Sequence, residues 1–537
     1  MAADETVPVL VVGGGLTGLS AAVFLRRLGV PVTVVERHRG ILVHPRARTV
    51  NPRTQELFRQ AGLAADVLDR RNVNTGELMI TAETLAGPER SRLGGEPAED
   101  PAEFSPCPWV PIDQDRLEAL LRKHAAELGA RLCFGTALKS FEQDADGVRA
   151  VVVDLDADTG NGAGAERTIS AEYLIAADGA DSPVRERLGI AGEGPGVLGD
   201  TVTLAFEADL SRHVGDRRIA VCHVDRPVPG TVIVPHDGAD RWVFSVPVTR
   251  VDAAEAADMI RKAVGDPGLE PRIVPQLQDG TRLLRYRIGA VVAERFRAGR
   301  VFLAGDAVHA MPPVGALGSG TGIQDVHNLA WKLAAVLNGH AGPGILDGYE
   351  AERRPVAAFT MRQALLQMRD RTGRNVLGTD EEAVPYYAIV FGYRYGNGGD
   401  PDGGDPAGPE AFPPERLTGQ VGTRAPHAWI RRDDQRISTL DLYRDRPVLV
   451  AGPEGGMWST SARTAADRLG VPLDVHRFGD GLHDPGDVWG DGHRMPPNGA
   501  VLVRPDGFVS WRSPDRPVSD AGDLVAGALA GLYHVGS

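Results

Sequence analysis

The chain has 537 residues, of which 42% are hydrophobic and 24% charged, and its formal net charge is −14. This length allows more than one domain, and the composition is ordinary for a globular protein. The negative charge argues against a nucleic-acid or anionic-membrane surface, because phosphate groups need clustered Lys and Arg, although a local basic pocket stays compatible with it.

The N-terminal residues and the cysteines bear on location. Two acids and no Lys or Arg precede the first apolar run, which lacks the basic start of a signal peptide. No uninterrupted apolar stretch approaches the ~18 residues of a membrane helix. The three cysteines, Cys107, Cys133 and Cys222, form no CxxC, so neither a disulfide framework nor a cysteine zinc site is predicted. We therefore expect a cytoplasmic protein that binds no membrane and no nucleic acid.

The first 36 residues are predicted to form a βαβ unit. Residues 7–12 and 30–36 are typical of buried parallel strands, and 16–28 place apolar residues at helical spacing. Gly13–Gly18 (GGGLTG) is a GxGxxG turn, whose glycines permit a tight turn, close approach to a pyrophosphate and close packing of helix and strand. The helix N-terminus adds free N–H groups. Glu36 ends the second strand, where an acid can bind a ribose hydroxyl, so the unit predicts a dinucleotide site.

Further elements follow in chain order. Residues 113–128, 323–337 and 346–370 are predicted helices. Segments between about 200 and 250 alternate like antiparallel strands and suggest a sheet of their own. Residues 396–415 have the composition of a linker or long loop, and 436–537 alternate strands and helices like a separate small α/β domain.

Two more motifs place an Asp at the end of a buried strand. In Tyr173–Arg185 (YLIAADGADSPVR) the strand ends at Asp178, and in Arg300–Pro313 (RVFLAGDAVHAMPP) it ends at Gly305 and Asp306. An Asp at a strand's carboxyl end can reach a ligand in the crevice there. Alone, the first motif is equally well explained by an ordinary Asp-Gly turn. Three strand-end motifs in one order indicate a shared site.

These motifs, with GIQDVHNLAWKL after them, resemble the successive fingerprints of the single-component FAD-dependent aromatic hydroxylases of the para-hydroxybenzoate hydroxylase type, over about residues 7–370. PRARTVNPRTQELF, FGYRY at 391–395 and a thioredoxin-like tail are similar to the bacterial aromatic-polyketide hydroxylases, the group of the aklavinone, tetracenomycin and angucycline oxygenases. The resemblance implies an α/β fold with a Rossmann-type FAD-binding domain, an interleaved antiparallel-sheet substrate domain and a C-terminal thioredoxin-like domain. The implied boundaries are 1–80, 110–195 and 290–375 for the FAD-binding domain, 81–109 and 196–289 for the substrate domain, 376–420 for a linker and 421–537 for the thioredoxin-like domain.

The resemblance also implies the residues that bind FAD. The glycine turn would hold the ADP pyrophosphate, Glu36 the ribose, and the third motif the ribityl or pyrophosphate region, while the second motif is associated with both FAD and NAD(P)H. The implied cofactor-binding residues are Gly13, Gly15, Leu16, Thr17, Gly18, Glu36, Arg37, Arg46, Gln114, Asp178, Arg185, Gly305, Asp306, Pro313, Leu317 and Gly318. One position departs from the family: Gly320 stands where Asn is frequent, so any flavin contact by that side chain is missing.

A substrate pocket is expected on the predicted strands at 200–250. One face of that sheet should cover the flavin and offer an apolar surface to a flat polycyclic ring system. The candidate lining residues are Phe206, Val232, Val234, Trp242 and Phe244. Each of them is about equally well explained as part of the sheet's own core.

The implied function is an FAD-dependent monooxygenase that consumes O2 and NADPH or NADH and hydroxylates a polycyclic aromatic polyketide in antibiotic-type secondary metabolism, through a flavin hydroperoxide. No catalytic side chain and no metal is expected, because the cofactor carries the chemistry, and His44, His309 and His327 are interpreted as packing or capping residues. A Baeyer–Villiger-type or ring-rearranging oxygenase is the alternative, and a flavin- or polyketide-binding protein without turnover is a further one. A flavin halogenase is disfavoured. That group carries a Trp-x-Trp-x-Ile-Pro segment, and no two tryptophans of this chain lie two residues apart. The thioredoxin-like tail lacks a CxxC, so we expect no dithiol chemistry there and a scaffold or dimer-contact role instead. The protein is expected to be a monomer or a homodimer.

Overall fold

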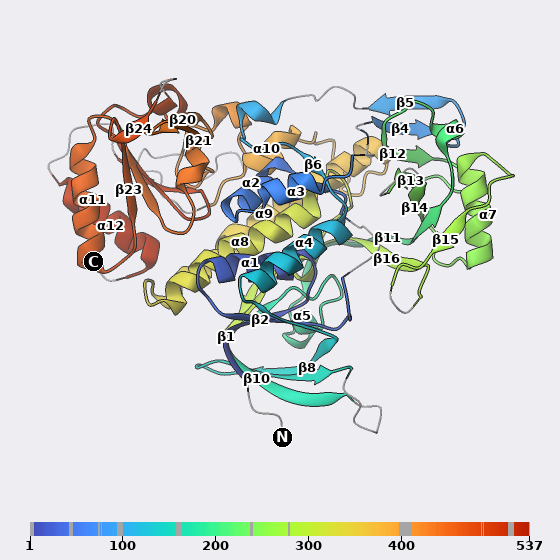
Figure 1. Cartoon of the computed structure of the whole chain (residues 1–537), viewed down its shortest axis with the longest axis horizontal. Helices are drawn as coiled ribbons and strands as arrows, with labels where there is room; N and C mark the ends of the chain where they lie inside the picture. The colour runs from blue at the N-terminus through green and yellow to red at the C-terminus, as the bar shows by residue number, and fades with distance from the viewer. Residues whose placement is uncertain are drawn as a thin grey trace.

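The computed structural model describes residues 5–41, 47–73, 76, 78–93, 100–156, 164–236, 240–277, 280–396, 411–484, 486, 488–513 and 520–535. Figure 1 shows three units around three sheets: one around β1 (Glu5–Val12) in the centre and below, one around β11 (Gly192–Glu207) on the right, and one around β23 (Asp474–Phe478) on the left, beside the C-terminus. The mixed α/β class predicted from the sequence is confirmed.

The central sheet contains the predicted βαβ unit. Its order is β17 (Arg297–Ala298), β18 (Val301–Leu303), β10 (Ala165–Ala176), β1, β2 (Val32–Glu36) and β7 (Arg131–Phe134), and β8 (Thr136–Gln143) and β9 (Val148–Asp154) join it through β10. Strands β18, β10, β1, β2 and β7 run parallel to their neighbours along this path. Parallel strands are covered on both faces, and Val9, Leu10 and Val11 are fully buried.

Long helices cover this sheet. α1 (Leu16–Arg27) packs against α4 (Gln114–Glu127) and α8 (Leu317–Leu337), while α9 (Asp347–Thr372) packs on α8; Figure 1 shows the four across the middle of the molecule. α8 starts at Leu317, six residues before the predicted start at residue 323. The sequence pattern did not indicate this first part as helix, because Gly318, Gly320 and Gly322 have low helix propensity. Close packing favours glycine there: a Cβ at Gly322 would lie 2.7 Å from Thr17 Oγ1.

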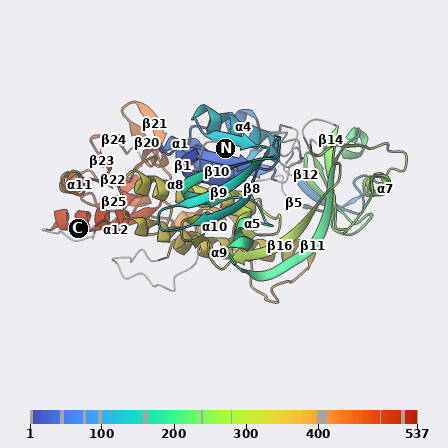
Figure 2. The ribbon, with the colours of Figure 1, turned by 90° about the horizontal axis from the view of Figure 1, so that it is seen from below.

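The second sheet is antiparallel for most of its width, as the segments at 200–250 predicted. Its order is β19 (His309–Ala310), β16 (Leu284–Ala293), β11, β14 (Arg241–Val246), β13 (Thr231–Pro235), β12 (Ile219–Val224), β4 (Leu78–Ala82) and β5 (Glu89–Leu93), with β15 (Arg272–Val274) on β11. α7 (Ala253–Val264) covers one face of this sheet, and Ile260, Ala263 and Val264 enter its core. In Figures 1 and 2 α7 lies at the outer end, away from the central helices.

The third sheet belongs to the C-terminal unit. Its order is β21 (Gln435–Ser438), β20 (Trp429–Arg432), β24 (Gly481–His483), β23, β22 (Val448–Ala451), β25 (Ala500–Val503) and β26 (Val509–Arg512). α11 (Gly456–Leu469) and α12 (Ala521–Tyr533) pack together on it. Its likeness to thioredoxin stays a prediction.

Shorter elements connect the units. They are β3 (Thr49–Val50) paired with β6 (Val110–Pro111), α2 (Pro52–Gln60), α3 (Ala64–Asp69), α5 (Pro183–Arg187), α6 (Ser211–Val214) and α10 (Tyr386–Phe391). α10 lies inside the predicted linker 376–420, yet Tyr387 and Ile389 are buried in a core with Leu317. Most of the glycine-rich part of that linker falls outside the described residues.

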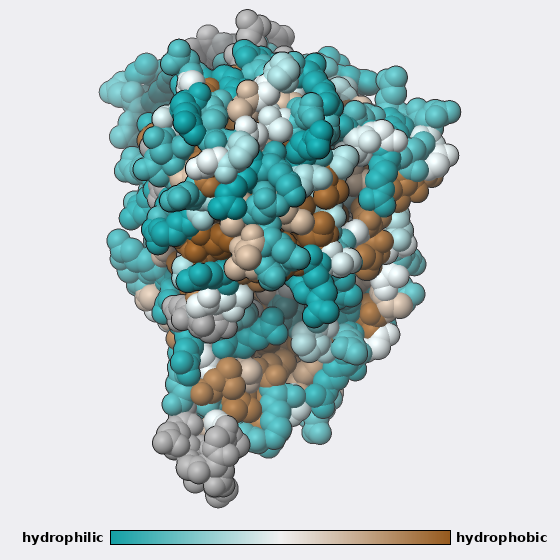
Figure 3. Space-filling model, turned by 90° about the vertical axis from the view of Figure 1, so that its right-hand side faces the viewer, coloured by the Kyte–Doolittle hydropathy of each residue, from teal (hydrophilic) through white to brown (hydrophobic). Residues whose placement is uncertain are grey.

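The surface at the outer end of the second sheet is mostly hydrophilic, with apolar side chains visible in several groups (Figure 3). Among the described residues, no helix has both the length and the apolar character to cross a membrane.

Candidate functional site

The three strand-end motifs meet at one edge of the central sheet. Val12 of β1 pairs with Ala176 of β10, and Ala176 pairs with Leu303 of β18. Because these strands are parallel and in register, the residues that follow them emerge side by side. The glycine turn, the Asp178 turn and the Gly305–Asp306 turn therefore share one crevice, where open α/β sheets bind ligands.

The glycine turn is shaped by close contacts on two sides and open space on the third. A Cβ at Gly13, whose φ is +108°, would lie 2.2 Å from the carbonyl oxygen of Ala177, and a Cβ at Gly18 would lie 1.9 Å from that of Gly13. At Gly15 the nearest atom is 3.7 Å away. Gly15 is also the N-cap of α1, and no described side chain caps it. The N-terminus of α1 therefore leaves room and N–H groups for a phosphate.

Glu36 lies at the same edge, at the end of β2. Its carboxylate accepts hydrogen bonds from the backbone N–H groups of Gly14 at 2.6 Å and His38 at 2.8 Å. Burial alone would raise the pKa of this carboxyl, but the hydrogen bonds from His38 and Gly14 outweigh it and hold the pKa below its ordinary value. An ionised acceptor at this position suits a ribose hydroxyl.

Asp178 and Arg185 connect the second motif to the third. Arg185 donates from Nη1 to the carbonyl oxygen of Ala307 at 2.6 Å. Asp178 Oδ2 accepts from Val184 N at 3.1 Å, whereas its buried Oδ1 has no hydrogen-bond partner among the residues that the structure describes. Burial raises the pKa of this carboxyl above its usual range. Such an orphaned oxygen indicates a position where a ligand can donate.

The Gly305–Asp306 turn packs on α1. Gly305 has φ +62°, and a Cβ there would lie 2.5 Å from Thr17 Oγ1. The carboxylate of Asp306 is exposed beyond the end of β18. Thr17, Gly305 and Gly322 thus join the starts of α1 and α8 to the third motif.

A narrow cavity continues from this edge toward the start of α8. Its lining residues come from α1, the segment around β3, the start of α2, the start of α4 with the residue Ile112 before it, and the start of α8: Leu16, Ala47, Thr49, Val50, Asn51, Thr54, Ile112, Gln114, Leu117, Ala316, Ser319, Gly320 and Ile323. Leu317 and Gly318 follow Ala316 at the first turn of α8. The open space at Gly15, the free N–H groups of α1 and the carboxylate of Glu36 fit the ADP part of an extended dinucleotide such as FAD.

Gly320 has a structural explanation. A Cβ at this position would lie 2.8 Å from Asn51 Nδ2 and 3.0 Å from Thr54 Oγ1. Asn51 caps α2 by accepting from Thr54 N at 2.8 Å. The Asn51 amide therefore occupies the space beside residue 320, and no sequence pattern indicated this contact.

Not all predicted cofactor residues can be placed. Arg46, like His44, lies outside the described residues. Arg37 and Pro313 are exposed. Gln114 lies at the start of α4, where its Oε1 accepts from Ala47 N at 3.0 Å in the cavity wall.

The five predicted substrate-pocket residues do not share one face. Phe206, Trp242 and Phe244 are buried in the core beneath α7. Val232 pairs with Ser245, and Val234 with Val243, so these two point to the opposite face. The prediction of one pocket from all five is therefore corrected: the large aromatic side chains form the sheet's own core.

The face opposite α7 is turned toward the central helices (Figures 1 and 2), and the end of β13 contacts a residue beside the cavity. Arg48 donates to the carbonyl oxygen of Pro235 at the end of β13 and pairs with Asp113 at 3.0 Å. Its neighbours Ala47 and Thr49 line the cavity. This face carries Thr203, His223, Val232 and Ser245 in one row across the strands. Burial, and then the charge of Arg371, lower the pKa of His223, which therefore stays neutral at neutral pH.

The histidines near the motifs are packed. His327 is half-buried, contacts the ring of Phe24 edge-on with centroids 4.8 Å apart, and has its pKa lowered to about 3, mainly by desolvation. His309 Nε2 donates to the buried Asp325 at 2.7 Å. Asp325 also accepts from Arg353 at 2.8 Å. The sequence motif GIQDVHNLAWKL contains Asp325 but does not indicate its pairing with His309 or Arg353.

Known proteins share this arrangement. Residues 6–364 match the family model of the FAD binding domain, and 418–531 match that of the aromatic-ring hydroxylase C-terminal domain. A putative polyketide hydroxylase from Streptomyces halstedii is 44% identical over 94% of this chain and 93% of its own, and the tetracenomycin A2 monooxygenase-dioxygenase of Streptomyces glaucescens is 41% identical over 97% and 96%. The crystal structure of aklavinone-11 hydroxylase with FAD and aklavinone superposes with a TM-score of 0.90 at 34% identity, covering 99% of this chain and 100% of that one. These matches confirm the resemblance found in the sequence, and the chain belongs to the FAD-dependent aromatic-ring hydroxylases.

Proposed function

We propose that this monooxygenase hydroxylates a polycyclic aromatic polyketide, with NADPH or NADH as reductant. The proposal is supported by the face of the second sheet opposite α7, which carries both apolar and polar side chains and is turned toward the central helices. The relatives named for tetracenomycin and aklavinone support the same class of substrate.

The proposed FAD contacts follow the edge of the central sheet. The N–H groups at Gly15 and the start of α1 would bind the pyrophosphate, Glu36 the ribose, and Asp306 the ribityl or pyrophosphate region. Leu317 and Gly318 would lie against the flavin ring. When bound and reduced, FAD supplies the activation of O2.

The protein's own task is to orient the substrate ring and to exclude water. On the face opposite α7, Val232 and Val234 offer apolar contacts, and the hydroxyls of Thr203 and Ser245, which lie 2.9 Å apart and bond to each other, add polar groups. The neutral imidazole of His223 in the same row can donate to, or accept from, a phenolic oxygen. A flat ring system with a few oxygens matches this combination, because each added ring buries further apolar area at about 25 cal/mol per Å².

The test compares ring systems. The holoprotein is incubated with NADPH or NADH and either a four-ring phenolic polyketide or para-hydroxybenzoate, and reductant consumed is compared with product formed. We expect tighter coupling with the four-ring compound. Equal or better coupling with the single-ring acid would reject the polyketide assignment and leave the hydroxylase family unaffected.

A further inference from the structure

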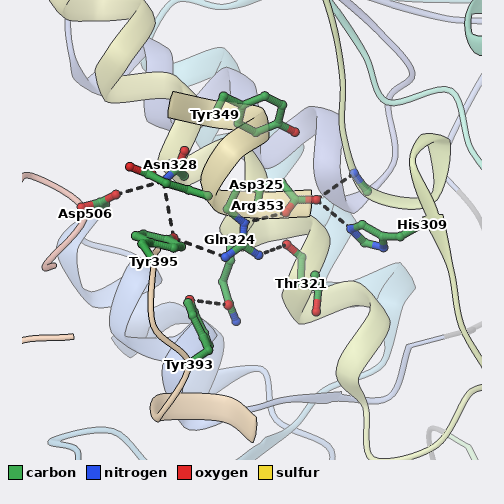
Figure 4. A network of polar contacts seen from close by, with 12 residues as sticks. His309, Thr321, Gln324, Asp325, Asn328, Tyr349, Arg353, Tyr393, Tyr395 and Asp506 are labelled. Atoms are coloured by element: carbon green, nitrogen blue, oxygen red, sulfur yellow. Dashed lines mark hydrogen bonds and ion pairs between the residues drawn. The ribbon is translucent and has the colours of Figure 1, made fainter. Parts of the chain in front are cut away.

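A buried network of charged and polar side chains joins the crevice to the C-terminal unit (Figure 4). It begins at Asp325 on α8. Asp325 Oδ2 accepts from the backbone N–H of Gly305 at 3.2 Å and from His309 at 2.7 Å, so one carboxylate holds both ends of the Gly305–Asp306 turn.

Arg353 on α9 holds this carboxylate in turn. Its Nε donates to Asp325 Oδ1 at 2.8 Å, its Nη2 donates to the carbonyl oxygen of Thr321 at 3.3 Å, and its Nη1 donates to Tyr395 Oη at 3.3 Å. Asp325 and Arg353 are fully buried. A buried ion pair keeps its geometry only while its partners stay in place, so the position of α9 determines the position of the turn.

The position of α9 relative to α8 depends on the C-terminal unit. Arg504, at the end of β25, makes a bidentate pair with Glu352 of α9 at 2.5 and 2.7 Å. Asp506 in the same hairpin turn accepts from Asn328 and Trp331 of α8, each at 3.2 Å. Glu352 completes the junction by accepting from Asn328 at 2.7 Å and from Lys332 at 2.6 Å.

The same hairpin turn also contacts the cavity wall. Arg53 of α2 donates to the carbonyl oxygen of Asp506 at 2.9 Å and lies over the ring of Phe508. Phe508 stacks on Tyr395, with centroids 4.1 Å apart. Because Thr54 follows Arg53 and lines the cavity with Asn51, a second chain of contacts leads from the turn to the start of α8.

We propose that the hairpin turn Arg504–Phe508 of the C-terminal unit is a positioning element of the flavin site, which acts through Glu352, Arg353 and Asp325 on the Gly305–Asp306 turn. The C-terminal unit is then required for tight FAD binding. Arg504 and Asp506 contribute indirectly, because their side chains contact α8 and α9 and none of the residues proposed to contact FAD. The inference rests on the proposed contact between FAD and Asp306.

The test measures the dissociation constant of FAD by the rise of flavin fluorescence as the holoprotein is diluted. Arg504→Gln should weaken binding about tenfold, within the range observed for residues that couple to a distant site, and Arg504→Lys should restore part of the loss. The matched control is Arg59→Gln. It removes another ion pair to the C-terminal unit, that of Arg59 with Asp441 at 2.8 Å, and should leave FAD affinity within about twofold.

A double variant tests the route. In an Asp325→Asn background, Arg504→Gln should add little further loss, because the connection is already broken. Wild-type affinity in Arg504→Gln, or full additivity in the double variant, would overturn the proposal. If Arg504→Gln does not fold, Asp506→Asn takes its place with the same two expected outcomes. Asp306→Ala separates the two ideas: normal affinity there would reject the proposed flavin contact, whereas weak binding there with normal affinity in Arg504→Gln and Asp506→Asn would reject only the positioning role.

Discussion

Replacing Phe244 with Ala should destabilise the second sheet and leave substrate affinity unchanged. The Phe244 ring is fully buried, and its neighbours across the strands are Leu204 and Ile233. All three side chains lie in the core that includes Ile260 of α7. Truncating a buried Phe to Ala typically costs about 3–5 kcal/mol, because it removes the transfer free energy and leaves a cavity.

The matched control is Val232→Ala, since Val232 pairs with Ser245, the residue after Phe244. Val232 points to the opposite face and is only partly buried. Val232→Ala removes two carbon atoms, so it should cost at most about 1.6 kcal/mol of stability. It should instead raise the KM for the substrate.

Both variants are assayed by urea unfolding, followed by tryptophan fluorescence, and by steady-state kinetics. The predicted result is a much lower urea midpoint with unchanged KM for Phe244→Ala, and a raised KM with a smaller fall in the urea midpoint for Val232→Ala. A raised KM without loss of stability in Phe244→Ala would refute the assignment of the two faces.

Three further predictions follow from the site and the core. Gly15→Val should fold normally and lose FAD, because its side chain enters the space proposed for the phosphates. Gly18→Ala should instead lower the melting temperature, because its Cβ meets the carbonyl oxygen of Gly13 at 1.9 Å. Flavin content and thermal melts distinguish the two variants, and a stable, FAD-loaded Gly15→Val would contradict the assignment. The pKa of His327 is lowered to about 3 in the folded chain, so the unfolded chain binds the proton first, and the free energy of unfolding should fall as the pH drops from about 6.5 towards 3; a His327→Gln variant with the same acid sensitivity would show that another group is responsible. Burial raises the pKa of the Cys107 and Cys222 thiols to about 12, so both should resist thiol reagents at pH 8 until the protein is unfolded, and rapid labelling of the native protein would disprove this.

The meeting of the three motifs at one edge of the central sheet could be predicted from the sequence because it depends on local pattern. A buried strand followed by Gly or Asp places that residue at the carboxyl edge, and three parallel strands bring Gly13, Asp178 and Asp306 together without further information. The Rossmann-type unit was predictable for the same reason. α8 was predicted too short, because the close contacts that require Gly322 come from α1 and the third motif.

Which side chains point to which face of the second sheet could not be predicted from the strands alone. Residues 232, 234, 242 and 244 are all apolar, so alternation does not distinguish the two faces. The answer depends on α7, which arrives later in the chain and covers the Phe244 side.

The buried network was also beyond the sequence. Asp506 reaches Asn328 across 178 residues, and no periodicity relates such positions. Asp325 lies in a motif that the sequence did single out, but its role in holding Gly305 depends on the three-dimensional placement of α8.

The most direct test of the central claim is the fate of molecular oxygen. The holoprotein is supplied with NADPH or NADH, ¹⁸O2 and a four-ring phenolic polyketide, and the product is analysed by mass spectrometry and NMR. The account predicts one ¹⁸O atom in a new ring hydroxyl and one NAD(P)H consumed for each product molecule. Reductant consumption that yields only hydrogen peroxide, or a product whose new oxygen comes from water, would contradict it.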